Sequence, residues 1–238
     1  MKKTIILILA ALLLLPILSS CGPKAAPAGA VTSETVGGTD HNVTGSETVI
    51  PETIDLADYD VSESESATDY VRITMKDGGV ILIALCPDAA PITVKNFKKL
   101  VGRHFYDGLI FHRVIENFMI QTGDPTGTGF HGSDETIKGE FALNGVANSL
   151  SHTRGTVSMA RTARDMNSAS SQFFIVQKDS QRSLDGSYAA FGRVISGMDV
   201  VDRIAAVTTD VYDKPTVDQV METVRFVTVK AKSAATEG

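Results

Sequence analysis

Residues 71–85 read VRITM (71–75), KDGG (76–79) and VILIAL (80–85). In the first of these runs apolar and polar side chains alternate, which is the two-residue period of a half-buried β-strand. The glycine-containing tetrapeptide is typical of a tight turn, and the apolar run after it predicts a partner strand. Together the three runs predict an antiparallel β-hairpin with which the folded part of the chain begins.

The chain from residue 86 to about residue 230 continues this pattern of short strands. We expect further strands at residues 110–114, 118–122, 156–160, 173–177, 190–194 and 224–229. Apolar residues recur at helical spacing in only two segments, 91–102 and 198–206. Pro91 suits a first helical position and Gly102 a helix end. Many short strands with two helices favour a mainly β fold, an antiparallel barrel or sandwich, over a parallel sheet.

The first 20 residues have the composition of a secretory signal peptide. Lys2 and Lys3 precede an apolar run at residues 5–15, which is shorter than the roughly 20 residues that a membrane-spanning helix needs. The chain then reads LSSC (18–21), which resembles the lipobox of bacterial lipoproteins, in which the cysteine is acylated. The resemblance implies that Cys21 carries lipid and anchors the protein to the extracytoplasmic face of the cell membrane, because two acyl chains suffice for stable anchoring. The alternatives are an ordinary signal peptide with an incidental cysteine and an uncleaved membrane helix.

The segment after the cysteine is rich in Ser, Thr, Gly and acidic residues. Ten of the 28 acidic residues lie between residues 22 and 69, against Lys24 alone among the 22 basic residues. Such a segment buries too little apolar surface to fold, so residues 21–68 are predicted to be a disordered tether, although scattered apolar residues at 49–59 leave room for a short strand or helix. Residues 70–238 hold the other 18 acidic residues and 19 basic ones. We therefore expect one near-neutral folded domain at residues 69–232 with no nucleic-acid partner, and a flexible tail at residues 233–238.

Seven short motifs follow one another in the predicted domain. They are FHRVI (111–115), NFMIQTGD (117–124), GTG (127–129), SMAR (158–161), SQFFI (171–175), LDG (184–186) and FG (191–192). In this order and spacing they resemble the cyclophilin family of peptidyl-prolyl cis-trans isomerases, over about residues 70–230. The resemblance implies a closed antiparallel eight-stranded β-barrel capped by two α-helices, in a monomer. It also implies an enzyme that isomerises X-Pro peptide bonds of polypeptides, here exported proteins folding at the outer face of the membrane.

This reaction requires neither a cofactor nor a metal, because no covalent bond is broken. Its barrier of about 18–20 kcal/mol comes from amide resonance, which a cation weakens by donating a hydrogen bond to the prolyl nitrogen. Arg113 matches the catalytic arginine of the family, and Gln121 matches the residue that positions it. His112 and His131 lack the cysteine or carboxylate cluster of a metal site, so we expect no metal.

The resemblance further implies ten substrate-binding residues. Phe118, Met119, Phe174 and Leu184 match the pocket for the proline ring, Ala160, Arg161 and Gln172 match the adjacent groove, and Phe111, His112 and Tyr188 complete the set. Taken singly, the aromatic residues would be core residues and Arg113 a solvated surface charge. Their joint occurrence in the order of the family favours a binding site.

Two positions depart from the pattern of the family. Ser183 stands where eukaryotic cyclophilins often have a tryptophan that assists cyclosporin binding, so we expect weak cyclosporin binding. Tyr188 replaces a histidine found in many relatives, and the stretch at residues 161–170 is slightly longer. Two other functions stay open: a proline-segment binding module or chaperone with little turnover, and a solute-binding lipoprotein, against which the small single domain argues.

Overall fold

The computed structural model describes residues 53–232. The predicted signal peptide at residues 1–20, Cys21, the tether up to residue 52 and the tail at residues 233–238 lie outside the described residues. Among the described residues, no helix is long and apolar enough to span a membrane.

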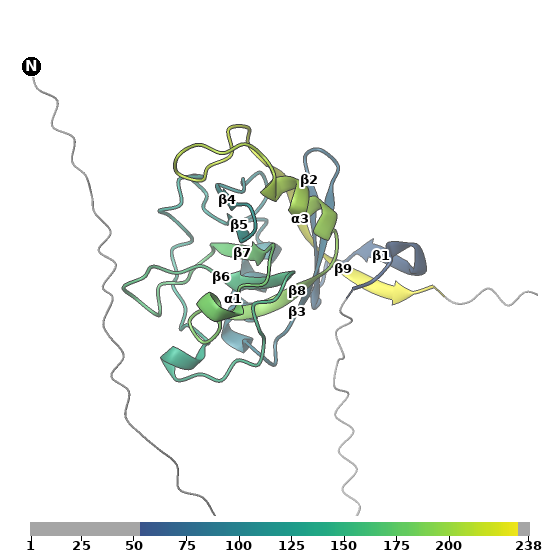
Figure 1. Ribbon diagram of the computed structural model, residues 1–238. Helices are drawn as coiled ribbons and strands as arrows, with labels where there is room; N and C mark the ends of the chain where they lie inside the picture. Colours follow the sequence, from purple (N-terminus) through teal and green to yellow (C-terminus); the bar gives the residue numbers. More distant parts are fainter. Residues whose placement is uncertain (1–52, 233–238) are drawn as a thin grey trace, which may run out of the picture. The chain divides into compact units, whose positions relative to one another are not determined.

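Nine antiparallel strands form one sheet in the order β1-β9-β2-β3-β8-β6-β7-β5-β4 (Figure 1). The strands are β1 (Tyr59–Glu63), β2 (Tyr70–Met75), β3 (Val80–Leu85), β4 (Arg113–Ile115), β5 (Met119–Thr122), β6 (Thr156–Met159), β7 (Phe173–Val176), β8 (Ala190–Ser196) and β9 (Met221–Ala231). The predicted hairpin is confirmed, because β2 pairs with β3 and places Val71 opposite Ile83. The mainly β, antiparallel character of the fold is confirmed as well.

The two helices predicted from apolar spacing are present as α1 (Pro91–Gly102) and α3 (Met198–Ala205). The carboxylate of Glu140 accepts hydrogen bonds from the backbone nitrogens of Ile92 and Thr93, at 3.0 and 2.8 Å. These bonds satisfy donors at the start of α1 that have no partner within the helix. A one-turn helix α2 (Gln181–Leu184) and the short 3₁₀ turn η2 (Ala142–Asn144) were not predicted. The 3₁₀ turn η1 (Leu56–Asp58) lies in the segment 49–59, for which a short strand or helix was left open.

The expectation of a closed eight-stranded barrel is wrong in two respects. The sheet has nine strands, and its end strands β1 and β4 do not pair with each other. Where closure would occur, one isolated bridge joins Ile110, ahead of β4, to Val220, ahead of β9. β4 is only three residues long, so it offers too little backbone to continue the ladder beyond that bridge.

The ninth strand, β1, comes from the segment predicted to be a disordered tether. β1 pairs with the C-terminal half of β9, from Tyr59 opposite Ala231 to Glu63 opposite Val227. Tyr59 and Val61 pack against a small apolar cluster that contains Leu82 and Val227. The domain boundary predicted at residue 69 is therefore too late, because residues 53–68 include ordered chain that buries apolar surface on the sheet.

Strands β4, β5, β7 and β6 present two different faces. Val114, Ile120, Ile175 and Val157 occupy consecutive register positions across these strands and belong to the main core. In each strand the residue next in sequence points to the opposite face, because side chains alternate along a strand. That second face carries a separate apolar cluster containing Met119, Phe174 and Val176. It is the face on which the expected site residues of these strands, Arg113, Met119, Gln121 and Phe174, lie.

Candidate active site

One row of register partners crosses the second face of the sheet. Arg113 on β4 lies opposite Gln121 on β5, Gln121 lies opposite Phe174 on β7, and Phe174 lies opposite Ser158 on β6. Side chains of directly paired residues project from the same face of an antiparallel ladder. Pairing alone therefore places the expected catalytic arginine, its expected positioning glutamine and an expected pocket residue side by side.

The row opens into a cavity of about 1040 Å³. Ten of the twelve predicted site residues line it: His112, Arg113, Phe118, Met119, Gln121, Ala160, Arg161, Phe174, Leu184 and Tyr188. Nine further lining residues were not predicted: Gly127, Thr128, Gly129, Phe130, Asp210, Val211, Tyr212, Asp213 and Lys214.

The floor of the cavity is apolar and has little contact with solvent. Met119, Phe174 and Leu184 are buried and form one cluster, against which the partly buried Phe118 and Tyr188 pack. The ring of Tyr188 meets the ring of Phe174 edge-on, with 5.8 Å between the centroids and 84° between the planes. Because protein interiors are close-packed, an open apolar slot of this kind is suited to receive a small apolar ring from outside.

Arg113 lies at the edge of this slot and remains in contact with solvent. Its side chain is 43% exposed, and its Nε lies 3.4 Å from the Oδ2 of Asp213. The backbone oxygen of Asp213 accepts a 2.8 Å hydrogen bond from the nitrogen of Val114, so the loop that carries Asp213 is fastened to β4. Within the described residues, the terminal nitrogens of Arg113 have no hydrogen-bond partner. They are available to a ligand in the slot.

Gln121 is held by Gln172 rather than by Arg113. Gln121 donates from Nε2 to the Oε1 of Gln172 at 2.8 Å. Gln172 in turn donates to the backbone oxygens of Gly129 and His131, at 3.0 and 2.7 Å. Gln172 was predicted to bind substrate directly, but it does not line the cavity. Its position indicates that it supports Gln121 instead. The described bonds of its side chain link β5 to the loop at residues 124–132.

Phe111 was also predicted to bind substrate, and its position contradicts that prediction. It is fully buried and belongs to the main core, on the other side of the sheet from the cavity. Phe111 lies ahead of β4 and on the opposite side of the sheet from Arg113, so the alternation of that strand does not extend back to it. Membership in the motif therefore did not determine which way each side chain points.

Asp124 fixes the loop at residues 124–132. Its buried carboxylate accepts hydrogen bonds from the backbone nitrogens of Thr126, Gly129 and His131, at 2.7, 2.6 and 3.2 Å. Burial alone would raise the pKa of Asp124, but these bonds outweigh it and hold the pKa far below its usual range. The carboxylate that anchors the loop is therefore ionised at neutral pH.

His112 is a buried titratable group beside the slot. It is only 4% exposed, and neither ring nitrogen has a hydrogen-bond partner within residues 53–232. Burial lowers the pKa of His112, opposed in part by the charge of Asp124, so the ring is neutral at neutral pH. The described part of the chain has no group of three His, Cys, Asp or Glu side chains placed to hold a metal ion.

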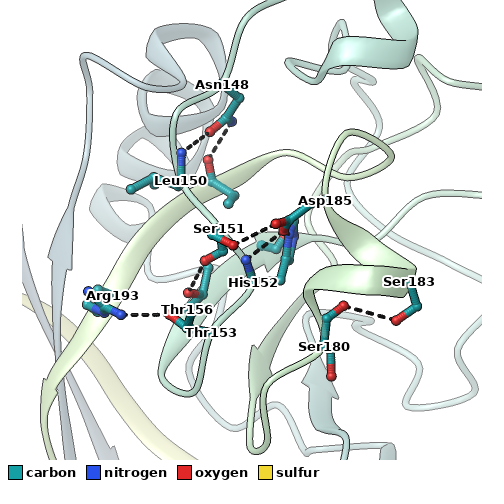
Figure 2. Close-up of polar contacts among 12 residues, drawn as sticks. Asn148, Leu150, Ser151, His152, Thr153, Thr156, Ser180, Ser183, Asp185 and Arg193 are labelled. Carbon is teal, nitrogen blue, oxygen red and sulfur yellow. Dashed lines mark hydrogen bonds and ion pairs between the residues drawn. The ribbon is translucent and has the colours of Figure 1, made fainter. Parts of the chain in front are cut away.

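A hydrogen-bonded network around the buried His152, next to Phe174, was not predicted from the sequence. The Nδ1 of His152 lies 2.7 Å from the Oδ1 of Asp185 (Figure 2). Its Nε2 lies 3.0 Å from the Oγ of Ser158, and its ring stacks on that of Phe174 with 6.1 Å between the ring centroids. Ser151 donates to the second carboxylate oxygen of Asp185 at 2.6 Å. The order of Ser158, His152 and Asp185 resembles that of a nucleophilic triad, but Ser158 is completely buried. The hydroxyl of Ser158 is therefore out of reach of a substrate, and the network supports the ring of Phe174 at the floor of the slot.

Known proteins are similar to this chain in both sequence and fold. Residues 70–226 match the family described as cyclophilin type peptidyl-prolyl cis-trans isomerase/CLD. The chain belongs to this family. It is 45% identical over 155 residues to a peptidyl-prolyl cis-trans isomerase of Acinetobacter baylyi, covering 63% of this chain and 79% of the relative. It is 44% identical over 155 residues to peptidyl-prolyl cis-trans isomerase-like 1 of Aspergillus fumigatus, covering 65% of this chain and 91% of the relative.

A solved structure agrees with this assignment. A cyclophilin-type isomerase of Cryptosporidium parvum, crystallised in the presence of the dipeptide Ala-Pro, superposes with a TM-score of 0.60 at 30% identity, covering 69% of this chain and 99% of that one. The protein is thus a peptidyl-prolyl cis-trans isomerase of the cyclophilin type.

Proposed function

We propose that this cyclophilin isomerises X-Pro bonds of exported polypeptides, with Arg113 as the catalytic residue and the slot of Phe118, Met119, Phe174 and Leu184 as the proline pocket. The observation that carries the proposal is the position of Arg113 in one register row with Gln121 and Phe174, at the edge of the slot. A proline ring seated in the slot brings its nitrogen to that edge.

In the proposed mechanism, the guanidinium of Arg113 donates a hydrogen bond to the prolyl nitrogen. This bond favours a pyramidal nitrogen, whose lone pair no longer conjugates with the carbonyl, and so lowers the resonance barrier of about 18–20 kcal/mol. The guanidinium stays charged at all relevant pH values and is geometrically stiff. Gln121, held by Gln172, is placed to position the substrate backbone beside it.

The magnitudes indicate that the cation cannot act alone. A ten-thousandfold acceleration requires a barrier about 5.5 kcal/mol lower, whereas one charge-assisted hydrogen bond contributes roughly 1.5–3 kcal/mol. The remainder is assigned to the apolar slot, which holds the ring while the preceding carbonyl rotates.

The wild-type protein tests this proposal against the alternative of a binding module. NMR exchange spectroscopy on an Ala-Pro-containing peptide measures the cis-trans rate directly, and line broadening of the peptide reports binding in the same sample. We expect accelerated exchange. Binding without acceleration would favour the proline-segment binding module or chaperone over the enzyme.

We further propose that the domain acts outside the cytoplasm, tethered through lipid on Cys21. The proposal is supported by the LSSC motif at residues 18–21 and by the position of β1. β1 is the first strand of the described chain and lies at the opposite end of the strand order from β4, which carries Arg113. No residue of β1 lines the cavity, so the strand nearest the predicted tether takes no part in the proposed site.

Mass spectrometry of the protein expressed in bacteria tests the tether. We expect a mature N-terminus at Cys21 with the mass of attached acyl chains, in the membrane fraction, and a Cys21→Ser protein without added lipid. An unmodified Cys21 in the wild type would contradict the lipid anchor and leave the isomerase proposal intact.

A further inference from the structure

Three exposed apolar side chains gather at the mouth of the cavity. Of the large apolar residues exposed in the described chain, the three with the greatest exposure are Val211 (90%), Phe130 (88%) and Tyr212 (82%), and all three line the cavity. Val217 and Leu143, exposed by 71% and 64%, do not line it. Single exposed apolar residues are ordinary, but a cluster of them around a cavity marks a binding surface.

The two loops that carry these side chains are held firmly. The Oδ1 of Asp210 accepts hydrogen bonds from the backbone nitrogens of Tyr212 and Lys214, at 2.8 and 3.0 Å, and the nitrogen of Asp210 donates to the oxygen of Lys214 at 2.8 Å. The nitrogen of Val114 binds this loop to β4 through Asp213. Asp124 and Gln172 fix the facing loop around Phe130.

This anchoring is what a binding subsite requires. A preorganised surface binds without a further loss of conformational freedom, whereas three apolar side chains held in water bring no benefit to the fold itself.

We infer that Phe130, Val211 and Tyr212 form a second subsite of the groove, which takes an apolar side chain of the polypeptide whose proline occupies the slot. The inference rests on the proposed function and adds a substrate class to it: unfolded segments in which proline has an apolar neighbour. The rim and the slot line one continuous cavity, so one extended chain reaches both.

The charges of the rim favour an apolar occupant over a charged one. The cavity is lined by two acidic residues, Asp210 and Asp213, and three basic residues, Arg113, Lys214 and Arg161. Arg161 is already stacked on the rings of Phe141 and Tyr188. Asp213 and Arg113 are already paired with each other. No excess of either sign remains to select a charged side chain, and an exported protein that has not yet folded exposes apolar side chains.

A peptide series tests the subsite. NMR exchange gives kcat/KM for peptides Gly-Gly-Xaa-Pro-Yaa-Gly, in which leucine or serine is placed in turn before and after proline. At one of the positions we expect leucine to be preferred by roughly tenfold, the usual discrimination of an apolar pocket. In the triple variant Phe130→Ser, Val211→Ser, Tyr212→Ser the ratio of leucine to serine should fall to within about twofold.

Matched controls use exposed apolar residues outside the cavity. Val217→Ser and Leu143→Ser should keep the wild-type leucine-to-serine ratio, and equal urea midpoints show that all variants fold. Turnover of all peptides without a leucine preference, or a preference that survives the triple variant, overturns the subsite while the isomerase stands. Absence of turnover on every peptide overturns the proposed function itself.

Sedimentation distinguishes a client from a second copy of the chain. We expect the wild type and the triple variant to sediment alike. A wild-type dimer that the triple variant abolishes would assign the three side chains to a contact between copies and contradict the subsite.

Discussion

The Nε of Arg113 lies 3.4 Å from a carboxylate oxygen of Asp213, a residue 100 positions later in the chain. Asp213 has a left-handed backbone, with φ of 64°, a conformation that costs energy for a residue with a side chain and that clusters at functional sites. The pair engages the Nε of the guanidinium, and the terminal nitrogens have no partner among the described residues. Asp213 is therefore expected to position the guanidinium of Arg113, the catalytic residue that we propose.

Asp213→Ala should reduce kcat/KM on an X-Pro peptide about two- to fivefold, in keeping with the contribution of a half-exposed ion pair. Asp213→Asn retains an oxygen that can accept from Nε and should give a smaller loss. The chemical shift of the Arg113 Nε proton should move further from its wild-type value in Asp213→Ala than in Asp213→Asn. Because this proton reports on one contact, its shift distinguishes a loss of positioning from a general loss of fold. Unchanged kcat/KM in Asp213→Ala would show that Asp213 does not position Arg113.

Arg161 stands between two aromatic rings and is expected to hold the cavity wall in place. Its guanidinium lies 4.8 Å from the ring centroid of Tyr188 and 5.2 Å from that of Phe141, and its Nε donates to the oxygen of Ser187 at 3.0 Å. Arg161→Ala should raise KM roughly two- to fivefold, the size of a cation–π contact at a partly exposed site. Steady-state kinetics checks this. Arg164→Ala, an exposed change in the same loop, should leave KM as in the wild type, and equal KM values in both variants would contradict the role of Arg161.

The stability of the domain should fall as the pH drops below about 6.5. Burial lowers the pKa of His152, despite the carboxylate of Asp185, and burial likewise lowers the pKa of His112. Each histidine is neutral in the folded state and regains its ordinary pKa of about 6.5 on unfolding, so the unfolded chain binds more protons below that pH. The free energy of unfolding then decreases by up to about 1.4 kcal/mol per pH unit for each histidine.

Urea unfolding at pH 8, 7, 6 and 5 measures this dependence. His152→Gln should weaken it, because one of the two groups is gone, even if the variant is less stable at every pH. A free energy of unfolding that stays constant from pH 8 to pH 5 would show that the histidines are not held neutral by burial.

Removing β1 should destabilise the domain without touching the cavity. A protein that begins at residue 69 lacks Tyr59 and Val61, which cover Leu82 and Val227. The loss of this apolar contact should lower the free energy of unfolding by on the order of 2–4 kcal/mol, compared with a protein that begins at residue 53. Urea midpoints of the two proteins check this, and equal midpoints would contradict a stabilising role for β1.

The cavity was predictable where the chain carries long motifs, and not where loops from distant segments meet. The resemblance of residues 111–124 and 171–175 to the motifs of the family assigned Arg113, Met119 and Phe174 to the site, and all three line the cavity. They come together because the strands that carry them pair residue for residue. Asp213, Phe130 and Tyr212 reach the cavity through loop turns stabilised by single carboxylates. Nothing local in the sequence distinguishes such turns from other polar turns.

Two failures have the same physical origin. β1 alternates correctly at Tyr59, Asp60 and Val61, but it is short and follows a polar segment, so its partner β9 decides its structure. Phe111 belongs to the run FHRVI, which resembles a motif of the family, yet it is buried in the core, because it lies ahead of β4 and outside its alternation. In both cases a tertiary contact outweighs the local pattern.

The central claim is that the charge of Arg113 lowers the isomerisation barrier at the edge of the apolar slot. The most direct test compares kcat/KM of the wild type and of Arg113→Ala on an X-Pro peptide by NMR exchange, with urea midpoints measured for both. The account predicts a loss of roughly 10- to 150-fold, the equivalent of one charge-assisted hydrogen bond, with an unchanged midpoint. An Arg113→Ala protein that folds normally and isomerises at the wild-type rate would contradict it.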